Sequence, residues 1–144
     1  MQIDENGINM LCELEGFRAC PYQDSEGIWT IGIGTTILPN GIHVTANTPC
    51  ISRDIALQYV NSYMSQIYLW LNNNLRWKPN QNQWNALCSF LYNTGIGDRF
   101  NSYVHTKQAI INGDIPAIIA GIMSVNNNGL LTKRRHIEIN MFNS

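Results

Sequence analysis

Apolar residues recur at intervals of three and four along much of the chain, a spacing that is typical of amphipathic helices. The first such stretch starts near Ile3 and ends before Gly16. A glycine suits the left-handed conformation that closes many helices, so Glu15 is expected in the last helical turn. Ser52 is a suitable N-cap for a second, longer helix, which the pattern extends over about residues 53–72.

Turn-forming residues divide the rest of the chain into short elements. Asn40-Gly41 between apolar residues predicts a hairpin turn. Shorter helical patterns follow from Pro79 to the C-terminus. Within them, Asn112-Gly-Asp114 is predicted to end one helix at the glycine and to begin the next with Asp114 as its N-cap.

A strand pattern separates the first two helices. Asp24-Ser-Glu-Gly27 is rich in turn formers, and β-branched and aromatic residues dominate 28–33, so a β-hairpin is predicted. If residues 25–27 form its loop, Tyr22 lies opposite Thr30. Residues two apart in a strand share a face, so Asp24 and Thr30 are expected to point the same way.

This stretch holds three residues with catalytic potential. Glu15 is expected at the negative end of a helix dipole, which opposes ionisation of its carboxyl group and makes it a candidate general acid. Asp24 and Thr30 add a carboxylate and a hydroxyl on the neighbouring hairpin. The residue types alone also fit a structural interpretation, with a capped helix, an Asx-type turn and an ordinary strand threonine.

The spacing of these residues resembles that of the lysozymes of tailed phages, glycoside hydrolase family 24. The signature of this family is Glu, eight residues, Asp, five residues, Thr, which Glu15, Asp24 and Thr30 match without a gap. The surrounding Glu-Gly-x-Arg, Tyr-x-Asp-x-Glu-Gly and Thr-Ile-Gly-x-Gly elements match as well, and the second is similar to the enzymes of T-even phages. The resemblance extends over nearly the whole chain.

The resemblance implies an α+β fold with two lobes, in one lysozyme-like domain over residues 1–144. A small N-terminal lobe with a β-hairpin is expected over about residues 1–52, followed by an inter-lobe helix over about 53–72 and a mostly helical C-terminal lobe over about 73–144. An extended polysaccharide is expected to bind in the cleft between the lobes.

The implied activity is that of a muramidase, which hydrolyses the β-1,4 bond between N-acetylmuramic acid and N-acetylglucosamine in peptidoglycan. Glu15 would protonate the leaving oxygen, while Asp24 and Thr30 would position a water for an inverting reaction. This chemistry requires neither a metal nor a cofactor. A lytic transglycosylase needs no positioned water, so Asp24 and Thr30 argue against that activity. A wall-binding module and a secreted antibacterial effector are two further interpretations on the same fold.

The family resemblance also implies residues outside this stretch. Tyr92, Ser102 and Thr36 are candidates for substrate binding, and Arg134 is expected to support the site by reaching towards Glu15. Two of them also have structural interpretations. Tyr92 can equally be a core residue. Ser102 can cap a helix, and for Ser102 we favour this capping role over substrate binding.

Charge and hydropathy limit the kinds of binding partner that we expect for this protein. Nine Lys and Arg against ten Asp and Glu give a net charge of −1, and nothing in that balance suggests nucleic-acid binding, for which a basic face would be expected. The same balance predicts weak electrostatic attraction to an anionic cell wall. No apolar stretch is long enough to insert into a membrane and no signal peptide is evident, so synthesis in the host cytoplasm is expected, as a monomer. Action on the periplasmic wall would then need permeabilisation of the membrane, for example by a holin.

The spacing of the four cysteines indicates neither a disulfide framework nor a metal site. Cys12, Cys20, Cys50 and Cys88 are widely and irregularly spaced, without a Cys-x-x-Cys pair or a histidine cluster, so no zinc site is expected. Four thiols in a chain without an export signal are more often buried and reduced, but the sequence does not decide whether any of them form a disulfide. A bridge between Cys12 and Cys20 is the alternative in an oxidising periplasm.

Overall fold

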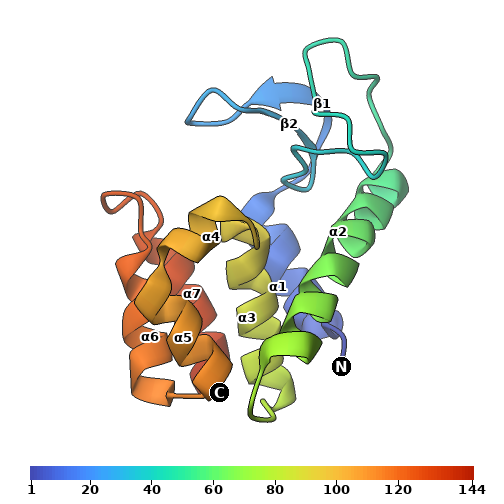
Figure 1. Ribbon diagram of the computed structural model, residues 1–144. Helices are drawn as coiled ribbons and strands as arrows, with labels where there is room; N and C mark the ends of the chain where they lie inside the picture. Colours follow the sequence, from blue (N-terminus) through green and yellow to red (C-terminus); the bar gives the residue numbers. More distant parts are fainter. The chain divides into compact units, whose positions relative to one another are not determined.

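The computed structural model describes all residues from 1 to 144 and contains seven helices and one two-stranded antiparallel sheet (Figure 1). In chain order the elements are α1 (Glu5–Glu15), β1 (Arg18–Gln23), β2 (Trp29–Gly32), α2 (Arg53–Asn74), α3 (Gln81–Thr94), α4 (Asp98–Ser102), α5 (Val104–Asn112), α6 (Ile115–Ser124) and α7 (Thr132–Asn143). This arrangement confirms the predicted α+β class.

The chain forms two compact units. The first, here called the hairpin unit, comprises Asn9–Ser65, and the second, here called the helical unit, comprises Met1–Ile8 and Gln66–Ser144. Helices α1 and α2 each contribute residues to both units. No helix of the chain has the length and apolar character needed to cross a membrane.

The hairpin follows the predicted register. Tyr22 pairs with Thr30 and Gln23 with Trp29, and the Asp24 amide donates to the Ile28 carbonyl over 2.9 Å. Gly27 in the loop has a φ of +77°, which a turn of this kind requires. A register shift interrupts the ladder between Arg18 and Tyr22.

The second predicted turn is present without strands around it. Gly41 has a φ of +85°, and its amide donates to the Leu38 carbonyl over 2.8 Å. An isolated bridge between Ile37 and His43 is the only ladder pairing at this turn. The Asn-Gly signal therefore located a reversal of the chain but not a second extended hairpin.

Helix α2 begins where its cap was predicted. The Ile55 amide donates to the Ser52 hydroxyl oxygen over 3.2 Å. The helix continues to Asn74, two residues beyond the predicted end, and the Asn74 side-chain amide donates to the Trp70 carbonyl over 2.7 Å. The asparagine run therefore ends the apolar stripe before it ends the helix.

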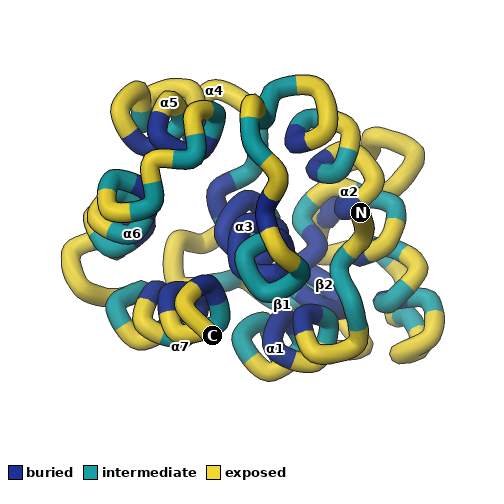
Figure 2. The backbone as a smooth tube through the Cα atoms, turned by 90° about the horizontal axis from the view of Figure 1, so that it is seen from below, coloured by how far each residue is buried: buried dark blue, intermediate teal, exposed yellow.

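The core of the helical unit is built on α3, which is buried along most of its length (Figure 2). A capping box between Asn80 and Gln83 starts this helix. Helix α3 packs against α7, and α5 packs against α6. As predicted, α5 closes on Gly113 in the left-handed conformation, and Asp114 caps α6.

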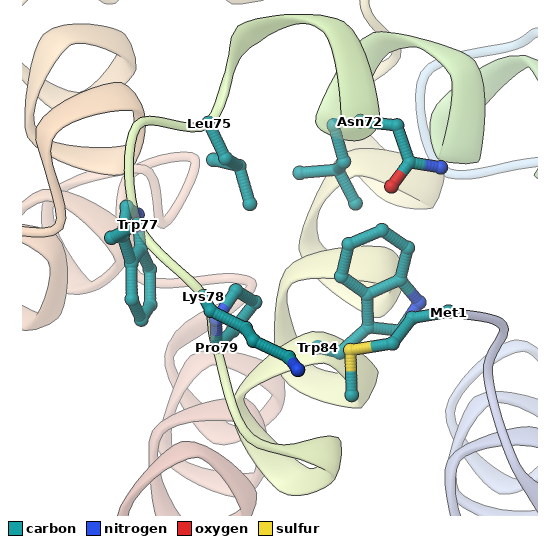
Figure 3. Close-up of a pocket in the computed structure, with 8 residues that line it drawn as sticks. Met1, Asn72, Leu75, Trp77, Lys78, Pro79 and Trp84 are labelled. Carbon is teal, nitrogen blue, oxygen red and sulfur yellow. The ribbon is translucent and has the colours of Figure 1, made fainter.

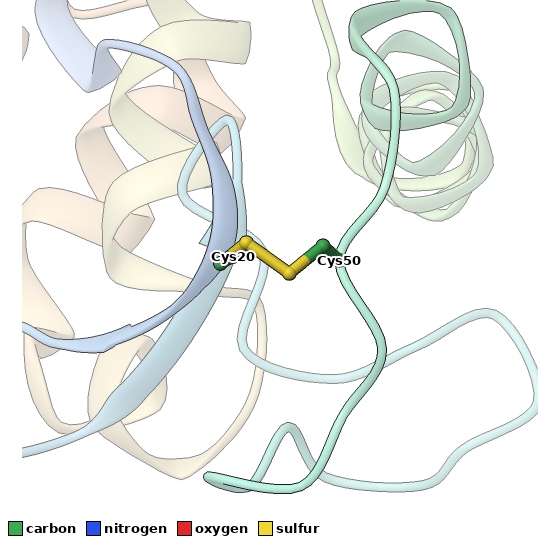
Figure 4. The surroundings of a disulfide bond; sticks show 2 residues. All are labelled: Cys20 and Cys50. Atoms are coloured by element: carbon green, nitrogen blue, oxygen red, sulfur yellow. A yellow bond between two sulfur atoms is a disulfide. The ribbon is translucent and has the colours of Figure 1, made fainter.

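The structure decides the redox state of the cysteines, which the sequence left open between four reduced thiols and a bridge. Cys20 in β1 and Cys50 before α2 form a disulfide (Figure 4), whereas Cys12 and Cys88 are free thiols. The alternative bridge between Cys12 and Cys20 is wrong. The pairing arises because the Ile51 amide donates to the Ala19 carbonyl over 2.8 Å, which brings the neighbouring residues of these two segments together.

We predict that thiol titration of the denatured protein yields two free thiols without reductant and four with it. A double Cys20→Ser and Cys50→Ser variant is expected to lose about 3–4 kcal/mol of unfolding free energy, because a bridge across 30 residues restricts the unfolded chain. Urea unfolding measures this loss. Four thiols without reductant would contradict the assignment.

Candidate active site

Glu15 is the last residue of α1. Gly16 follows with a φ of +70°, and its amide donates to the Cys12 carbonyl over 2.8 Å, so the helix closes at the predicted glycine. The Glu15 side chain is half-buried. The helix end thus holds this carboxyl group at the border between the protein and the solvent.

A tight turn after β2 fits closely against Glu15. Ile31 and Thr35 exchange two backbone hydrogen bonds of 2.9 and 3.0 Å, and Gly34 between them has a φ of +71°. A Cβ atom at Gly34 would collide with the carboxyl end of the Glu15 side chain. The last glycine of the Thr-Ile-Gly-x-Gly element is therefore needed for the placement of Glu15 as well as for the turn.

We predict that Gly34→Ala lowers kcat about ten- to a hundredfold, because the new methyl group must displace the Glu15 carboxyl and small misplacements of a reacting group are costly. Gly41→Ala is the matched control, since Gly41 also has a positive φ but has no atom within 4 Å of an added Cβ. Both variants are expected to lose about 1–2 kcal/mol of stability from backbone strain. Equal activity in the two variants would contradict a role for Gly34 in placing Glu15.

Asp24 is fixed by the hairpin loop. Its Oδ1 accepts hydrogen bonds from the Glu26 amide over 2.8 Å and from the Ile28 amide over 2.9 Å, which is the Asx-type turn of the structural interpretation. Both bonds engage the same oxygen, so Oδ2 is the oxygen available to a water or a ligand. The turn and a catalytic role are therefore compatible.

Thr30 is buried in β2, with 3% of its surface exposed. Its hydroxyl donates to the Ile28 carbonyl over 2.9 Å. This bond uses the only proton of the hydroxyl and leaves its lone pairs as acceptors. Thr30 can consequently accept a hydrogen bond from a water but has no second proton to donate.

Tyr22 lies in the same unit as these three residues, although no role was predicted for it from the sequence. The pKa of Tyr22 is raised, first by burial and then by the negative charges of Glu15 and Asp24, while Arg18 opposes the shift. Both carboxylates therefore act electrostatically on one phenol, which itself pairs with Thr30 across the hairpin. Its position two residues before Asp24 was the sequence signal that placed it on this face.

Arg134 belongs to a buried polar network in the helical unit. Its Nε donates to Glu138 Oε2 over 3.3 Å, and its Nη2 donates to the Ser89 carbonyl over 3.1 Å. The Ser89 hydroxyl in turn donates to Glu138 Oε2 over 2.5 Å. Glu138 and Ser89 are fully buried, so this network fixes the Arg134 side chain from two directions.

Arg135 extends the network on the other side of Glu138. Its Nη1 donates to Glu138 Oε1 over 2.6 Å and its Nη2 to Asn93 Oδ1 over 2.5 Å. Its guanidinium also lies 4.9 Å from the centre of the Phe90 ring. Ser89 and Asn93 belong to α3, so these hydrogen bonds join α3 to α7.

The three residues expected to bind substrate lie in different places. Thr36 is in the hairpin unit, where its carbonyl accepts the Val44 amide over 2.9 Å. Tyr92 is half-buried near the end of α3 in the helical unit. The favoured capping role of Ser102 is wrong: its hydroxyl donates backwards to the Arg99 carbonyl over 2.5 Å, and α5 starts at Val104 after Tyr103, which provides no side-chain cap. Ser102 is exposed at the end of α4.

The helical unit also contains a pocket of about 220 Å³ that the sequence did not predict. Leu75, Trp77, Lys78 and Trp84 surround it, as Figure 3 shows, and the indole N–H of Trp84 is buried without a hydrogen-bond partner. None of the candidate catalytic residues lines this pocket. No group of three or more His, Cys, Asp or Glu side chains in the chain is arranged to hold a metal ion.

Comparison with known protein families gives one matching family. The profile described as phage lysozyme matches residues 12–138, which include Glu15, Asp24, Thr30 and the Arg134–Glu138 pair. The endolysin of Salmonella phage P22 is 38% identical over 101 residues, a stretch that covers 66% of this chain and 64% of that endolysin. The matched stretch thus spans just under two thirds of the length of this curated relative.

Solved structures with the same fold cover more of both chains. A crystal structure of a P22 lysozyme mutant has a TM-score of 0.76 and 28% identity, covering 100% of this chain and 99% of that chain. The endolysin of Escherichia coli O157:H7 phage FAHEc1 has a TM-score of 0.80 and 25% identity, covering 99% of this chain and 93% of that chain.

Proposed function

This chain belongs to the phage lysozyme family, and from that premise we propose that it is a muramidase acting on bacterial peptidoglycan. The reaction is hydrolysis of the β-1,4 bond between N-acetylmuramic acid and N-acetylglucosamine. The observation that carries the proposal is that Glu15, Asp24 and Thr30 lie in one unit and share Tyr22 as a neighbour. Glu15 and Asp24 act electrostatically on Tyr22, and Thr30 pairs with Tyr22 across the hairpin.

Glu15 is the proposed general acid. Its carboxyl group donates a proton to the glycosidic oxygen as the bond from that oxygen to the muramic acid C1 breaks. The helix end and the turn at Gly34 hold the carboxyl group in one place, which favours proton transfer to a bound sugar. The leaving N-acetylglucosamine keeps this proton on its O4 hydroxyl.

Asp24 and Thr30 position the attacking water. The water donates one hydrogen bond to Asp24 Oδ2 and one to the lone pairs of Thr30 Oγ1, attacks C1, and passes a proton to Asp24. Attack from the face opposite the leaving group inverts the configuration at C1. The hydrogen bonds to Asp24 Oδ1 and from the Thr30 hydroxyl support this role because they hold both side chains in place.

We assign contributions to substrate binding to Thr36, Tyr92 and Ser102, and a supporting role to Arg134, whose fixed guanidinium provides a positive charge for an acidic partner. The biological role is that of an endolysin in host lysis. The protein is made in the host cytoplasm as a monomer and reaches the periplasmic wall after a holin permeabilises the membrane.

The test is digestion of purified peptidoglycan, with the products identified by mass. A muramidase releases hydrated reducing ends of muramic acid. Anhydro ends, lighter by one water, would instead assign the protein to the lytic transglycosylases and remove the role of the water held by Asp24 and Thr30. Binding to the wall without any released ends would leave a wall-binding module.

A further inference from the structure

Tyr22 shares a face of the hairpin with two of the proposed catalytic residues. Thr30 is its direct partner across the two strands, and Asp24 follows two residues later. Partners across an antiparallel pair and residues two apart in one strand project from the same face. The Tyr22 ring therefore stands beside both the carboxylate and the hydroxyl that position the water.

The hydroxyl of Tyr22 is available to a ligand. No hydrogen bond within the protein engages this hydroxyl, and the surroundings that shift the pKa of Tyr22 are burial and the charges of Glu15, Arg18 and Asp24. Because burial and both carboxylates raise the pKa above its ordinary value of 10.0, the phenol keeps its proton at neutral pH. A neutral phenol is a hydrogen-bond donor, whereas Asp24 when ionised and Thr30 with its proton already used are acceptors.

Arg18 holds the ring from one side. Its guanidinium carbon lies 4.3 Å from the centre of the Tyr22 ring, which is the geometry of a cation–π contact. The register shift in β1 falls between these two residues, and such irregularities change the direction in which strand side chains point. The half-buried ring is thus restrained by a contact within its own strand.

From this geometry we infer that Tyr22 is a further substrate-binding residue, whose O–H donates a hydrogen bond to an oxygen of the saccharide at the bond to be cleaved. The inference rests on the proposed function. Glu15 and Asp24 both act electrostatically on Tyr22, so a sugar that reaches these two carboxylates also comes near the Tyr22 hydroxyl. The hydroxyl, ring and N-acetyl oxygens of that sugar can all accept a hydrogen bond. Arg18 is a positioning residue that acts through the ring.

The test is Tyr22→Phe, which removes only the hydroxyl. The loss of one neutral hydrogen bond is expected to weaken binding by about three- to tenfold. We expect kcat/KM on soluble uncross-linked glycan strands to fall by that factor, mainly because KM rises. In a second measurement, Tyr22→Phe is added to the Glu15→Gln variant, and the Kd for the same strands is expected to rise by a similar factor. Tyr63→Phe is the matched control, because it removes the same hydroxyl from a half-buried tyrosine of α2, outside the hairpin, and it should leave both constants unchanged.

A double-mutant cycle tests the role of Arg18. Arg18→Gln is expected to raise KM in the wild type and to have little further effect in Tyr22→Phe, because the position of the ring no longer matters once the hydroxyl is gone. Unchanged Kd and kcat/KM in Tyr22→Phe would overturn the inference, and an Arg18 effect that persists in that background would overturn the positioning role. If the wild type releases no reducing ends, the proposed function fails, while the Kd comparison still decides whether Tyr22 binds glycan.

Discussion

Glu15→Gln is expected to lower kcat by about a hundredfold to ten-thousandfold while leaving the fold intact. Glutamine has the shape of glutamate but no proton that it can give to a leaving oxygen, and general acid catalysis contributes about that range of rate. Glu15 is half-buried at a helix end, and Gly34 leaves space for a side chain of this size, so the exchange creates neither a cavity nor a clash. The measurement is the initial rate of reducing-end release from purified peptidoglycan.

Glu13→Gln is the matched control for this experiment. It makes the same chemical change in the same helix, at an exposed position outside the proposed site, and is expected to keep the wild-type rate. The Kd of glycan strands should remain near the wild-type value in Glu15→Gln, since the loss concerns the transition state. A Glu15→Gln variant that digests walls at the wild-type rate would rule out Glu15 as the acid.

Glu138→Ala is expected to produce the largest loss of stability, about 3–5 kcal/mol. The fully buried Glu138 carboxylate accepts hydrogen bonds from Arg134, Arg135 and Ser89, and removing one member of a buried charge network leaves the desolvation of the others uncompensated. Burial already lowers the pKa of Arg135, and Glu138 is the main influence that opposes this shift. A loss of this size is a large fraction of the total stability of a typical domain, about 5–15 kcal/mol.

Urea unfolding measures this loss. Trp70, Trp77 and Trp84 lie in the helical unit and report its unfolding by fluorescence. Glu138→Gln, which retains an acceptor oxygen of similar shape, is expected to lose less than Glu138→Ala, and the exposed Glu13→Gln is expected to stay within about 0.5 kcal/mol of the wild type. A Glu138→Ala variant as stable as Glu13→Gln would contradict the structural importance of the network.

Local patterns determined much of the fold of this protein. The end of α1 at Gly16, the hairpin register that pairs Tyr22 with Thr30, and the start of α2 at Ser52 all agree with the sequence analysis. These features depend on the conformations of a few neighbouring residues, such as the positive φ of a glycine or a hydroxyl within reach of an amide. The signature spacing likewise identified the family, because the residues of that signature are close together in the chain.

Contacts between distant segments were decided by the tertiary structure. The pairing of Cys20 with Cys50 depends on where the chain returns after 30 residues, which the cysteine spacing does not encode. The wrong interpretation of Ser102 has a different, local cause, because its hydroxyl bonds to the Arg99 carbonyl in the preceding turn and α5 starts after Tyr103. Three other features also join separate elements: the close fit of Gly34 against Glu15, the position of Tyr22 near the proposed catalytic residues, and the network around Glu138. These residues come close to each other only once their elements pack.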